Sequence, residues 1–533
     1  MPLGTKSPFT SIGTLLSALL LVATLTESKA AVPKRPPNIV IFMIDDLGWN
    51  HISVKQTTMG NQRQECRTPE LEKLAADGLS FTHAYAQPNC APTRAAMLSG
   101  QYPARIHNDV YAVGNLNRHS GLAKNGISFQ APQQSEDVGP EAVTIAEALK
   151  KNGYATAHIG KYHVGGHRGK STLPENAGFD INIGGYTQGH QPVCFAEEKG
   201  GSWRFAGLGR GDFDRYAAPY TSEYLEKNRF PAELAGTPKH IGDAMGDALE
   251  TTITTLAGKG QPFYIQFHTY AVHLPVKSRP DLRKAAKESG ASNPDYAGFV
   301  RGFDENMRRL RELLEDPNGD GDHADSISKD TLILFTSDNG GWLGGNAPLK
   351  GVKGMFTEGG IRVPLIACWP GVIRPGGVTD HMVHSVDYYA TCLELAGKRW
   401  MPAAATHPLD GSSFATVLRD PAGAKPRGPI FYLFPGYLGK RAQPCAVVID
   451  DLLGKRYKLS YDYETVSWEL YCITDDLSES RNLIDSRRDV AAALSVKMHT
   501  WLTRQHPTWK PKYPFHKKSR KSAGPPPVLP PTP

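Results

Sequence analysis

The sequence lacks the features that mark fibrous or disordered proteins. Its 53 glycines and 41 prolines in 533 residues follow no triplet period, which excludes a collagen-like chain. Hydrophobic residues make up 40% of the chain, enough for a core, so wholesale disorder is also excluded. No internal repeat is present. The length allows two to four domains, or one large α/β core with an appendage.

Net charge is missing from the body of the chain. The formal charge of the whole sequence is +7, but residues 1–30 carry +1 and residues 510–533 carry +6, which leaves residues 31–509 neutral. A neutral body does not favour polyanion binding over the whole surface, and we expect no nucleic-acid partner. Residues 510–533 combine lysines with proline pairs, which predicts a tail that is disordered and has no fold of its own.

A long hydrophobic run is also missing. The apolar stretch 12–22 follows Lys6 and precedes Ser28-Lys29-Ala30, the pattern of a secretory signal over residues 1–30 with cleavage before Ala31. A membrane anchor is the alternative, but it needs about 20 apolar residues. No cysteine lies near the cleavage site, so a lipid anchor is not indicated. We therefore expect an exported protein, periplasmic or secreted, with no transmembrane segment in the mature chain.

The chain has few cysteines, and their number is odd. In an exported protein seven cysteines leave at least one unpaired. The sequence allows two alternatives, up to three disulfides or several buried free thiols. We expect the unpaired one to be Cys90. The others are Cys66, Cys194, Cys368, Cys392, Cys445 and Cys472.

Strands and helices alternate through most of the chain. Strands are expected at 38–44, 79–85, 154–159, 262–267, 331–337 and 363–369, and helices at 69–77, 92–99, 141–152, 241–257, 301–315 and 386–396. This pattern predicts an α/β fold over residues 31–424, with a large, mostly parallel central sheet between helices. The pattern differs in residues 425–509, where we expect short strands at 428–434, 455–461 and 467–473 and a helix at 490–504. This arrangement predicts a smaller antiparallel-sheet subdomain.

Polar side chains follow two of the expected strands. Asp45 and Asp46 come directly after the first strand, and Asp338 and Asn339 follow the strand at 331–337. Ligands bind where loops leave the carboxyl ends of parallel strands. Close carboxylates repel each other unless a cation lies between them, and oxygen donors suit Ca²⁺ or Mg²⁺. An Asp pair can also be a helix cap, but two clusters at equivalent strand ends favour a metal site.

Cations and a thiol accompany these acids. Cys90 is expected at a helix N-terminus with Arg94 one turn later, where the helix dipole and the guanidinium would stabilise an anion. Lys161 and His163 follow the strand at 154–159. His273 follows the strand at 262–267, and Lys353 lies in a glycine-rich segment. Together these residues place positive charge beside a candidate metal site and a candidate nucleophile. Such an arrangement can bind an ester of a tetrahedral oxyanion and stabilise the charge that develops as the group is transferred.

The motifs resemble those of a known family. Cys90-x-Pro92-x-Arg94 with Leu98-Ser99-Gly100 resembles the signature of formylglycine-dependent, arylsulfatase-type sulfatases in the alkaline phosphatase superfamily. The elements around Asp45, Lys161, His273, Asp338 and Lys353 follow in the same order. Small departures are Thr93, Met97, Ser99 and Tyr162, none of which removes a chemical group. The resemblance implies an alkaline phosphatase-like fold.

The resemblance also implies roles. A maturation enzyme would oxidise Cys90 to formylglycine, whose hydrate attacks the sulfur of a sulfate ester. Asp45, Asp46, Asp338 and Asn339, with the modified Cys90, would hold Ca²⁺ rather than Mg²⁺. Arg94 and Lys161 would steady the modified side chain, His163 would accept its proton, and Lys353 would bind sulfate. His273 would protonate the leaving alcohol, and Lys161, His273 and Lys353 would contact substrate.

Other interpretations are weighed against this one. A phosphonate or phosphate ester hydrolase of the same superfamily is the main alternative, and a glycan-binding protein with a broken site would lack some of these groups. Asp316-x-Asn318-x-Asp320-Gly321 imitates a calcium loop, but Ile327 stands where its last ligand belongs.

The substrate is expected to be a sulfated carbohydrate or a small sulfate ester. The aperiodic segments 106–138 and 164–239 are expected to set specificity, with His190, Trp203 and Arg204 as candidate sugar contacts.

Overall fold

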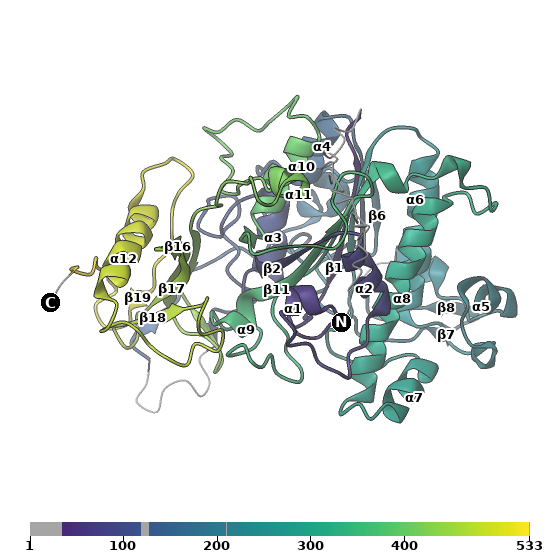
Figure 1. Cartoon of the computed structure of the whole chain (residues 1–533), viewed down its shortest axis with the longest axis horizontal. Helices are drawn as coiled ribbons and strands as arrows, with labels where there is room; N and C mark the ends of the chain where they lie inside the picture. The colour runs from purple at the N-terminus through teal and green to yellow at the C-terminus, as the bar shows by residue number, and fades with distance from the viewer. Residues whose placement is uncertain (1–34, 119–126, 209–210, 532–533) are drawn as a thin grey trace, which may run out of the picture.

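The computed structural model describes residues 35–118, 127–208 and 211–531. The expected signal sequence lies outside these residues. Two sheets organise the described chain, a large one near the middle of the molecule and a smaller one toward its C-terminal end (Figure 1). None of the helices in the described ranges has the length and hydrophobicity needed to span a bilayer.

The large sheet has nine strands among the described residues. Its order is β12 (Gly377–Thr379), β2 (Leu79–Tyr85), β11 (Arg362–Cys368), β10 (Thr331–Ser337), β1 (Asn38–Ile44), β9 (Phe263–His268), β5 (Ala155–Gly160) and β6 (Ile181–Ile183), and β13 (Val383–His384) also pairs with β2. All pairs are parallel except those of β11, which runs antiparallel to both β10 and β2. The expected α/β fold with a mostly parallel sheet is confirmed.

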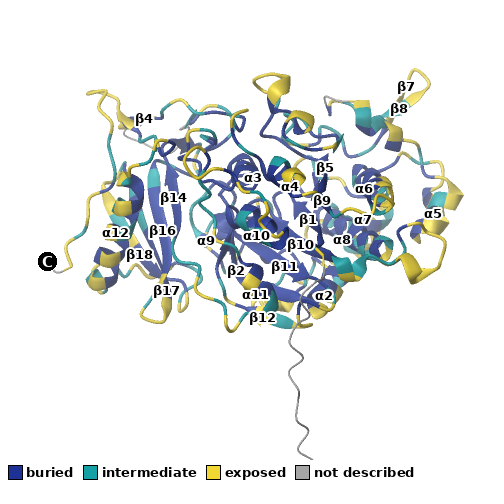
Figure 2. Cartoon of the chain, turned by 90° about the horizontal axis from the view of Figure 1, so that it is seen from above, coloured by how far each residue is buried: buried dark blue, intermediate teal, exposed yellow. Residues whose placement is uncertain are grey.

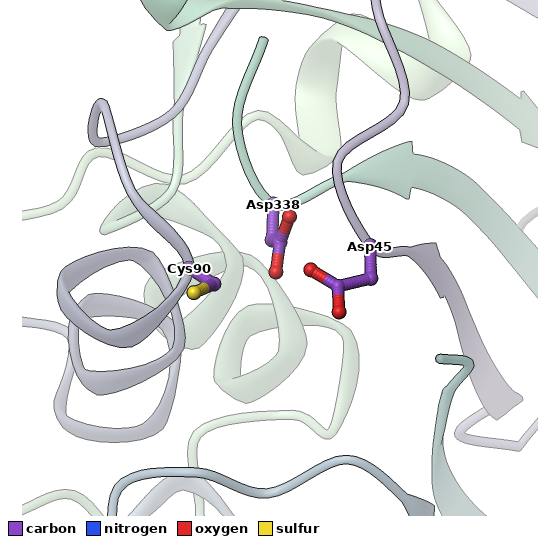
Figure 3. A group of neighbouring side chains, drawn as sticks. All are labelled: Asp45, Cys90 and Asp338. Carbon is purple, nitrogen blue, oxygen red and sulfur yellow. The ribbon is translucent and has the colours of Figure 1, made fainter. Parts of the chain in front are cut away.

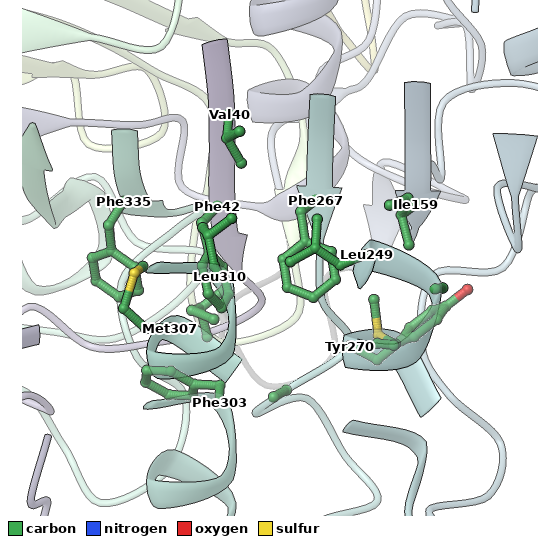
Figure 4. Packing of buried hydrophobic residues seen from close by; sticks show 14 of the residues in the cluster. Val40, Phe42, Ile159, Leu249, Phe267, Tyr270, Phe303, Met307, Leu310 and Phe335 are labelled. Atoms are coloured by element: carbon green, nitrogen blue, oxygen red, sulfur yellow. The ribbon is translucent and has the colours of Figure 1, made fainter. Parts of the chain in front are cut away.

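Strand β1 explains why the sheet is covered on both faces. Alternate side chains of a strand point to opposite faces, and every residue of this strand is buried. Val40, Phe42 and Ile44 belong to one hydrophobic cluster, and Ile39, Ile41 and Met43 belong to another. Figure 4 shows the first cluster, where Phe42 and Phe267 meet side chains such as Leu310 of the helix α8 (Pro294–Glu315).

The main helices cover the two faces of this sheet. The cluster of Figure 4 includes residues of α6 (Ile241–Ala257) and α8. The opposite cluster includes residues of α3 (Cys90–Ser99), α4 (Ile145–Lys151) and α10 (Asp387–Leu395). The other α-helices that precede the smaller sheet in the described chain are α1 (Lys55–Thr58), α2 (Pro69–Ala76), α5 (Ser222–Asn228), α7 (Pro280–Glu288), α9 (Glu358–Ile361) and α11 (Ala415–Arg419).

Capping explains where several helices begin. Helix α4 begins later than expected because Thr144 and Glu147 form a reciprocal capping box. Helix α8 begins earlier, where the Asn293 side chain accepts from the Tyr296 amide. Thr68 precedes α2 as expected but makes no capping bond; the Asp304 carboxylate accepts from the Glu70 and Leu71 amides instead.

The smaller sheet is antiparallel and packs against one helix. Its order is β14 (Ile430–Phe434), β16 (Cys445–Leu452), β17 (Lys455–Asp462) and β18 (Ser467–Cys472), and α12 (Arg488–Thr503) covers one face. Its strands are largely buried while α12 is exposed on its outer side (Figure 2). The sequence predicted three of these strands and the helix but missed β16.

The tail does not behave as expected. Residues 510–531 pack against the body instead of forming a disordered segment: β19 (Phe515–His516) pairs with β4 (Phe129–Gln130), and the Leu529 amide donates to Ser495 Oγ at 2.9 Å. The reason is apolar content, because Tyr513 and Leu529 pack against the cluster beneath α12. Proline-rich composition alone did not reveal those contacts.

All seven cysteines are free thiols in the structure. The possibility of three disulfides is therefore wrong, and Cys90 is not the only unpaired cysteine. Most of these thiols are buried as small apolar groups; burial raises the pKa of Cys66 and of Cys392 to about 12. Cys66 and Cys392 are accordingly members of the two main hydrophobic clusters.

Candidate functional site

The site lies at the carboxyl ends of the parallel strands. Asp45 and Asp46 follow β1, Asp338 and Asn339 follow β10, and Cys90 is the first residue of α3. Figure 3 shows Asp45, Asp338 and Cys90 next to one another, and one ligand atom from each lies within 4.8 Å of the other two. The strand topology thus brings together residues almost 300 positions apart in the chain.

Backbone geometry fixes the acidic turns. Asp46 has a φ of 62°, a conformation that non-glycine residues rarely adopt. Its amide donates to Asp338 Oδ1 at 3.1 Å, and Asn339 Nδ2 donates to Asp46 Oδ1 at 2.9 Å. Gly340 must be glycine because a Cβ there would lie 1.9 Å from the carbonyl oxygen of Gly359. The two strand ends are therefore locked together.

Each of the three carboxylates has its own cation. Lys161 Nζ lies 2.7 Å from Asp45 Oδ2, and Arg94 Nη2 lies 2.8 Å from Asp338 Oδ2. Lys353 Nζ lies 2.5 Å from Asp46 Oδ1. We call these six residues the site cluster; all of them are buried.

Burial and neighbouring charges set the protonation of the site cluster. Burial raises the pKa of Asp45 well above its usual value; the Lys161 ammonium opposes this shift, and the carboxylates of Asp338 and Asp46 add to it. Burial would also raise the pKa of Asp46, but Lys353 and His273 hold it below its usual value. Asp45 is thus the acid least compensated by the protein itself.

Two oxygen atoms in the site have no partner. Asp45 Oδ1 and Asn339 Oδ1 are buried without a hydrogen bond within the described chain. Leaving such atoms unpaired costs about 1–3 kcal/mol each. Carboxylate and amide oxygens are the donors that hard divalent cations prefer, so the residues present fit Ca²⁺ or Mg²⁺.

His163 lies beside the basic residues and is buried. Its φ is 70°, its amide donates to Tyr186 O at 2.9 Å, and its Nδ1 has no hydrogen-bond partner among the described residues. A Cβ at Gly189 would come within 2.4 Å of His163 Nε2, so this glycine leaves room for the ring. Burial, then Lys161 and Arg94, lower the pKa of His163 well below its usual value. The ring is therefore a neutral base.

His273 lies at the edge of the site. Its Nε2 is 3.7 Å from Asp46 Oδ2, its Nδ1 is 2.9 Å from Leu274 O, and its ring stacks on His190 with 5.7 Å between centroids. Burial lowers the pKa of His273 to about 4, although Asp46 opposes the shift. Because a carbonyl can only accept, the neutral ring carries its proton on Nδ1.

A pocket of about 280 Å³ opens above Cys90, and we call it the catalytic pocket. Asp46, Cys90, His273 and Lys353 line it, as expected. The sequence did not single out the other main lining residues, which are Ala112, Val113, Leu274, Trp342, Leu438 and Arg441. The Arg441 guanidinium lies 4.9 Å from the centroid of the Trp342 ring. Trp342 could have been found, since it follows Asn339 closely; Arg441, from the loop before β16, carries no such signal.

His268 was also missed. It ends β9, where its backbone oxygen accepts from the Lys161 amide at 2.9 Å and its Nδ1 lies 3.4 Å from Arg94 Nη1. It therefore contacts two members of the site cluster, Lys161 and Arg94.

Two expected sugar contacts lie elsewhere. Trp203 and Arg204 belong to β8 (Ser202–Arg204), which pairs with β7 (Glu197–Lys199), and Arg204 Nη2 binds Glu197 Oε1 at 2.9 Å. Neither lines the catalytic pocket. The calcium-loop imitation is a polar loop, where Asp316 accepts from the Gly319 and Gly321 amides.

Comparisons with known proteins agree with this geometry. Residues 37–398 match the family model described as sulfatase, and residues 352–506 match that of the N-sulphoglucosamine sulphohydrolase C-terminal region. A sulfatase of Formosa agariphila is 36% identical over 92% of this chain and 93% of its own length. The N-acetylgalactosamine-6-sulfatase of Mus musculus is 31% identical, covering 87% of this chain and 79% of its own.

Solved structures share the fold. Ps i-CgsB, in complex with k-i-k-neocarrahexaose, has a TM-score of 0.65 at 24% identity and covers 91% of this chain and 96% of its own. The PsFucS1 sulfatase from Pseudoalteromonas sp. has a TM-score of 0.61 at 22% identity, covering 89% of this chain and 92% of its own. With a family model matched over more than half of its residues and strand ends that carry the expected groups, the chain belongs to the sulfatase family.

Proposed function

We propose that this sulfatase hydrolyses sulfate monoesters of carbohydrates, with Cys90 as the precursor of its nucleophile. The observation that carries the proposal is the position of Cys90, which starts α3 and has its Sγ within 4.8 Å of a carboxylate oxygen of Asp45 and of Asp338. The relatives support a sugar substrate, since one is named an N-acetylgalactosamine-6-sulfatase and one solved structure holds a neocarrahexaose. A signal at residues 1–30 would export the enzyme to the periplasm or the medium.

Asp45, Asp46, Asp338 and Asn339 would hold Ca²⁺, and the two unpartnered oxygens support this assignment. The bound ion would supply positive charge beside the sulfate oxygens. Lys353 and Lys161 would add charge of the same sign from the protein, so the sulfate is held from several sides.

Cys90, oxidised to formylglycine by a maturation enzyme and hydrated, would supply the hydroxyl that attacks sulfur. Arg94 is held by Asp338 at its Nε and Nη2 and would orient this residue from the next helical turn. His163 is neutral and buried, so it can accept a hydroxyl proton at a ring nitrogen. Lys161 would steady the same group.

His273 would protonate the leaving alcohol through Nε2. The ring is neutral at neutral pH because burial lowers its pKa to about 4. An anionic ester bound next to it would raise the pKa again, so the ring would gain a proton as the substrate binds. Its place on the lining of the catalytic pocket supports this role.

The test compares wild type with Cys90→Ala and Cys90→Ser. We expect wild type to release sulfate from an aryl sulfate and from members of a panel of sulfated monosaccharides, and both variants to lose this activity. Mass spectrometry of the peptide containing residue 90 should show the aldehyde in wild type alone. Sulfate release by Cys90→Ala would contradict the nucleophile, and faster turnover of aryl phosphate or phosphonate esters would favour the alternative hydrolase.

A further inference from the structure

A second pocket lies against the C-terminal sheet. It has a volume of about 380 Å³ and is bounded on one side by residues of β17 and β18 and on the other by the segment Met355–Thr357. We call it the C-terminal pocket. Pockets that bind small ligands measure about 300–1,000 Å³, so this one is large enough for a sugar ring.

The C-terminal pocket adjoins the catalytic pocket. Arg441 lines both, and one short segment contributes Lys353 to the first and Met355–Thr357 to the second. Arg441 Nη1 also donates to the backbone oxygen of Lys353 at 3.3 Å, which fixes the guanidinium at the boundary. A ligand that extends from Cys90 past Arg441 would reach the C-terminal pocket.

The lining suits sugar hydroxyl groups. Its polar side chains include Gln443, Ser460, Asp462, Thr465, Ser467 and Glu469. Phe356 and Met355 add an apolar wall. Few polar groups are needed to orient a ligand, and hydroxyls can donate to carboxylates and accept from the amide.

Charge distinguishes the two pockets. Lys353, Arg441 and one carboxylate, that of Asp46, line the catalytic pocket. In the C-terminal pocket Arg441 is accompanied by three carboxylates, those of Asp462, Glu469 and Glu479. Its one lysine, Lys458, is neutralised by Glu479 at 2.5 Å and Glu358 at 3.1 Å. An anionic group would meet repulsion there, whereas an uncharged sugar would not.

We propose that the enzyme binds an oligosaccharide, with its sulfated sugar in the catalytic pocket and an unsulfated, uncharged neighbouring sugar in the C-terminal pocket. This inference rests on the proposed function for the sulfated sugar. It adds the chain length of the substrate and the charge of the neighbouring residue. Uniformly sulfated chains are then poor substrates, and chains with alternating sulfation are good ones.

Calorimetric binding to the inactive Cys90→Ser protein tests this without turnover. This protein is titrated with galactose, N-acetylgalactosamine and glucosamine sulfates, and with disaccharides in which the same sulfated sugar has an uncharged or an anionic neighbour; sulfate release is followed separately with wild type. We expect the uncharged disaccharide to bind about tenfold more tightly than the monosaccharide, a gain of about 1.4 kcal/mol. The anionic disaccharide should show no such gain.

Three variants locate the effect. Ser467→Trp places bulk in the C-terminal pocket and should remove the gain. Glu469→Lys reverses a charge there and should shift the preference toward the anionic disaccharide. Leu453→Trp is the matched control, on an exposed turn outside the pocket, and should keep the wild-type ratio.

The outcomes separate the two proposals. Equal affinity for monosaccharide and disaccharide, or a gain that survives Ser467→Trp, would overturn the C-terminal pocket while leaving sulfate hydrolysis intact. Tight binding that depends on Ser467 without any release of sulfate would support the pocket and contradict the proposed function. Absence of binding by every sugar would overturn both.

Discussion

Two buried charge clusters contain the two ends of the segment 353–358, Lys353 in one cluster and Glu358 in the other. They differ in how many of their polar atoms have a hydrogen-bond or ion-pair partner. The site cluster joins three carboxylates to three cations but leaves Asp45 Oδ1 and the neighbouring Asn339 Oδ1 without partners among the described residues. The second, which we call the Glu358 cluster, joins Glu358, Glu479, Lys458, Arg362 and Tyr85, and leaves no side-chain atom unpaired in the same part of the chain.

The difference separates the proposed metal site from a cluster with a structural role. Both clusters are buried and both pair opposite charges, so burial and ion pairs do not distinguish them. Unpaired oxygens do, because a buried acceptor is costly unless a ligand completes it. The Glu358 cluster is structural, because Lys458 of β17 holds Glu358 of α9 and Glu479 together through their two carboxylates.

The largest expected effect comes from breaking the Glu358 cluster. Lys458→Met leaves Glu358 and Glu479 buried without their cation, and we expect a loss of about 3–5 kcal/mol in the free energy of unfolding. Urea denaturation measures it. The control is Lys455→Met, at another lysine of β17. It removes an exposed ion pair with Asp475 and should change the free energy of unfolding little. Similar losses in both variants would contradict the structural role of the cluster.

The next effect concerns Ca²⁺ and should be confined to the site cluster. An ion that binds only the folded state adds about 2.7 kcal/mol at one hundred times its dissociation constant. Wild type should therefore be stabilised by added Ca²⁺ and destabilised by a chelator, as followed by thermal unfolding. Asp338→Asn should lose this response, whereas Lys458→Met should keep it. A Ca²⁺ response of full size in Asp338→Asn would remove the proposed ligand set.

The smallest expected effect concerns His407, a histidine outside both clusters whose two ring nitrogens are hydrogen-bonded. Burial lowers the pKa of His407 to about 4 from its usual 6.5, and both ring nitrogens have backbone partners, Ser99 O at 2.8 Å and the Val143 amide at 3.4 Å. A lowered histidine pKa stabilises the fold above pH 6.5 and loses that contribution as the pH falls toward 4. The loss amounts to roughly 1 kcal/mol by about pH 5.5.

His407→Gln isolates this contribution. The variant should be less sensitive to acid between pH 6.5 and 4 than wild type, as measured by denaturation at several pH values. Parallel pH curves for the two proteins would mean that His407 is not held neutral by the fold.

The large sheet could be predicted well from the sequence because its central strands are unusually apolar and end sharply. Strand β1 and strand β10 are continuous apolar runs that stop at aspartates, so both strand bounds and the acidic residues after them could be inferred. Strand β16 was missed because its core, Ala446 to Ile449, is short, and its pairing partners are set by tertiary contacts. The predicted helix starts erred where capping partners, such as those of α4, decided the bound.

The site divides in the same way. Residues that directly follow strands, such as Lys161, were predictable because parallel strands end at one edge. Arg441 was not, because it reaches the catalytic pocket from a loop of the C-terminal sheet, and no local pattern encodes that docking. The choice between disulfides and buried free thiols stayed open in the sequence for a related reason: cysteine count carries no information on the distance between thiols.

The reversed direction of β11 has a consequence for how the two sheets depend on each other. Because this strand runs against its neighbours, the chain reaches the catalytic edge before the strand begins, and Lys353 and Glu358 lie on the same approach. Lys353 contacts Asp46, and five residues later Glu358 contacts Lys458 of the C-terminal sheet. The C-terminal sheet thus serves as an anchor for Lys353, the lysine that we propose binds sulfate. A chain truncated before that sheet would lose substrate affinity even if the large sheet still folded.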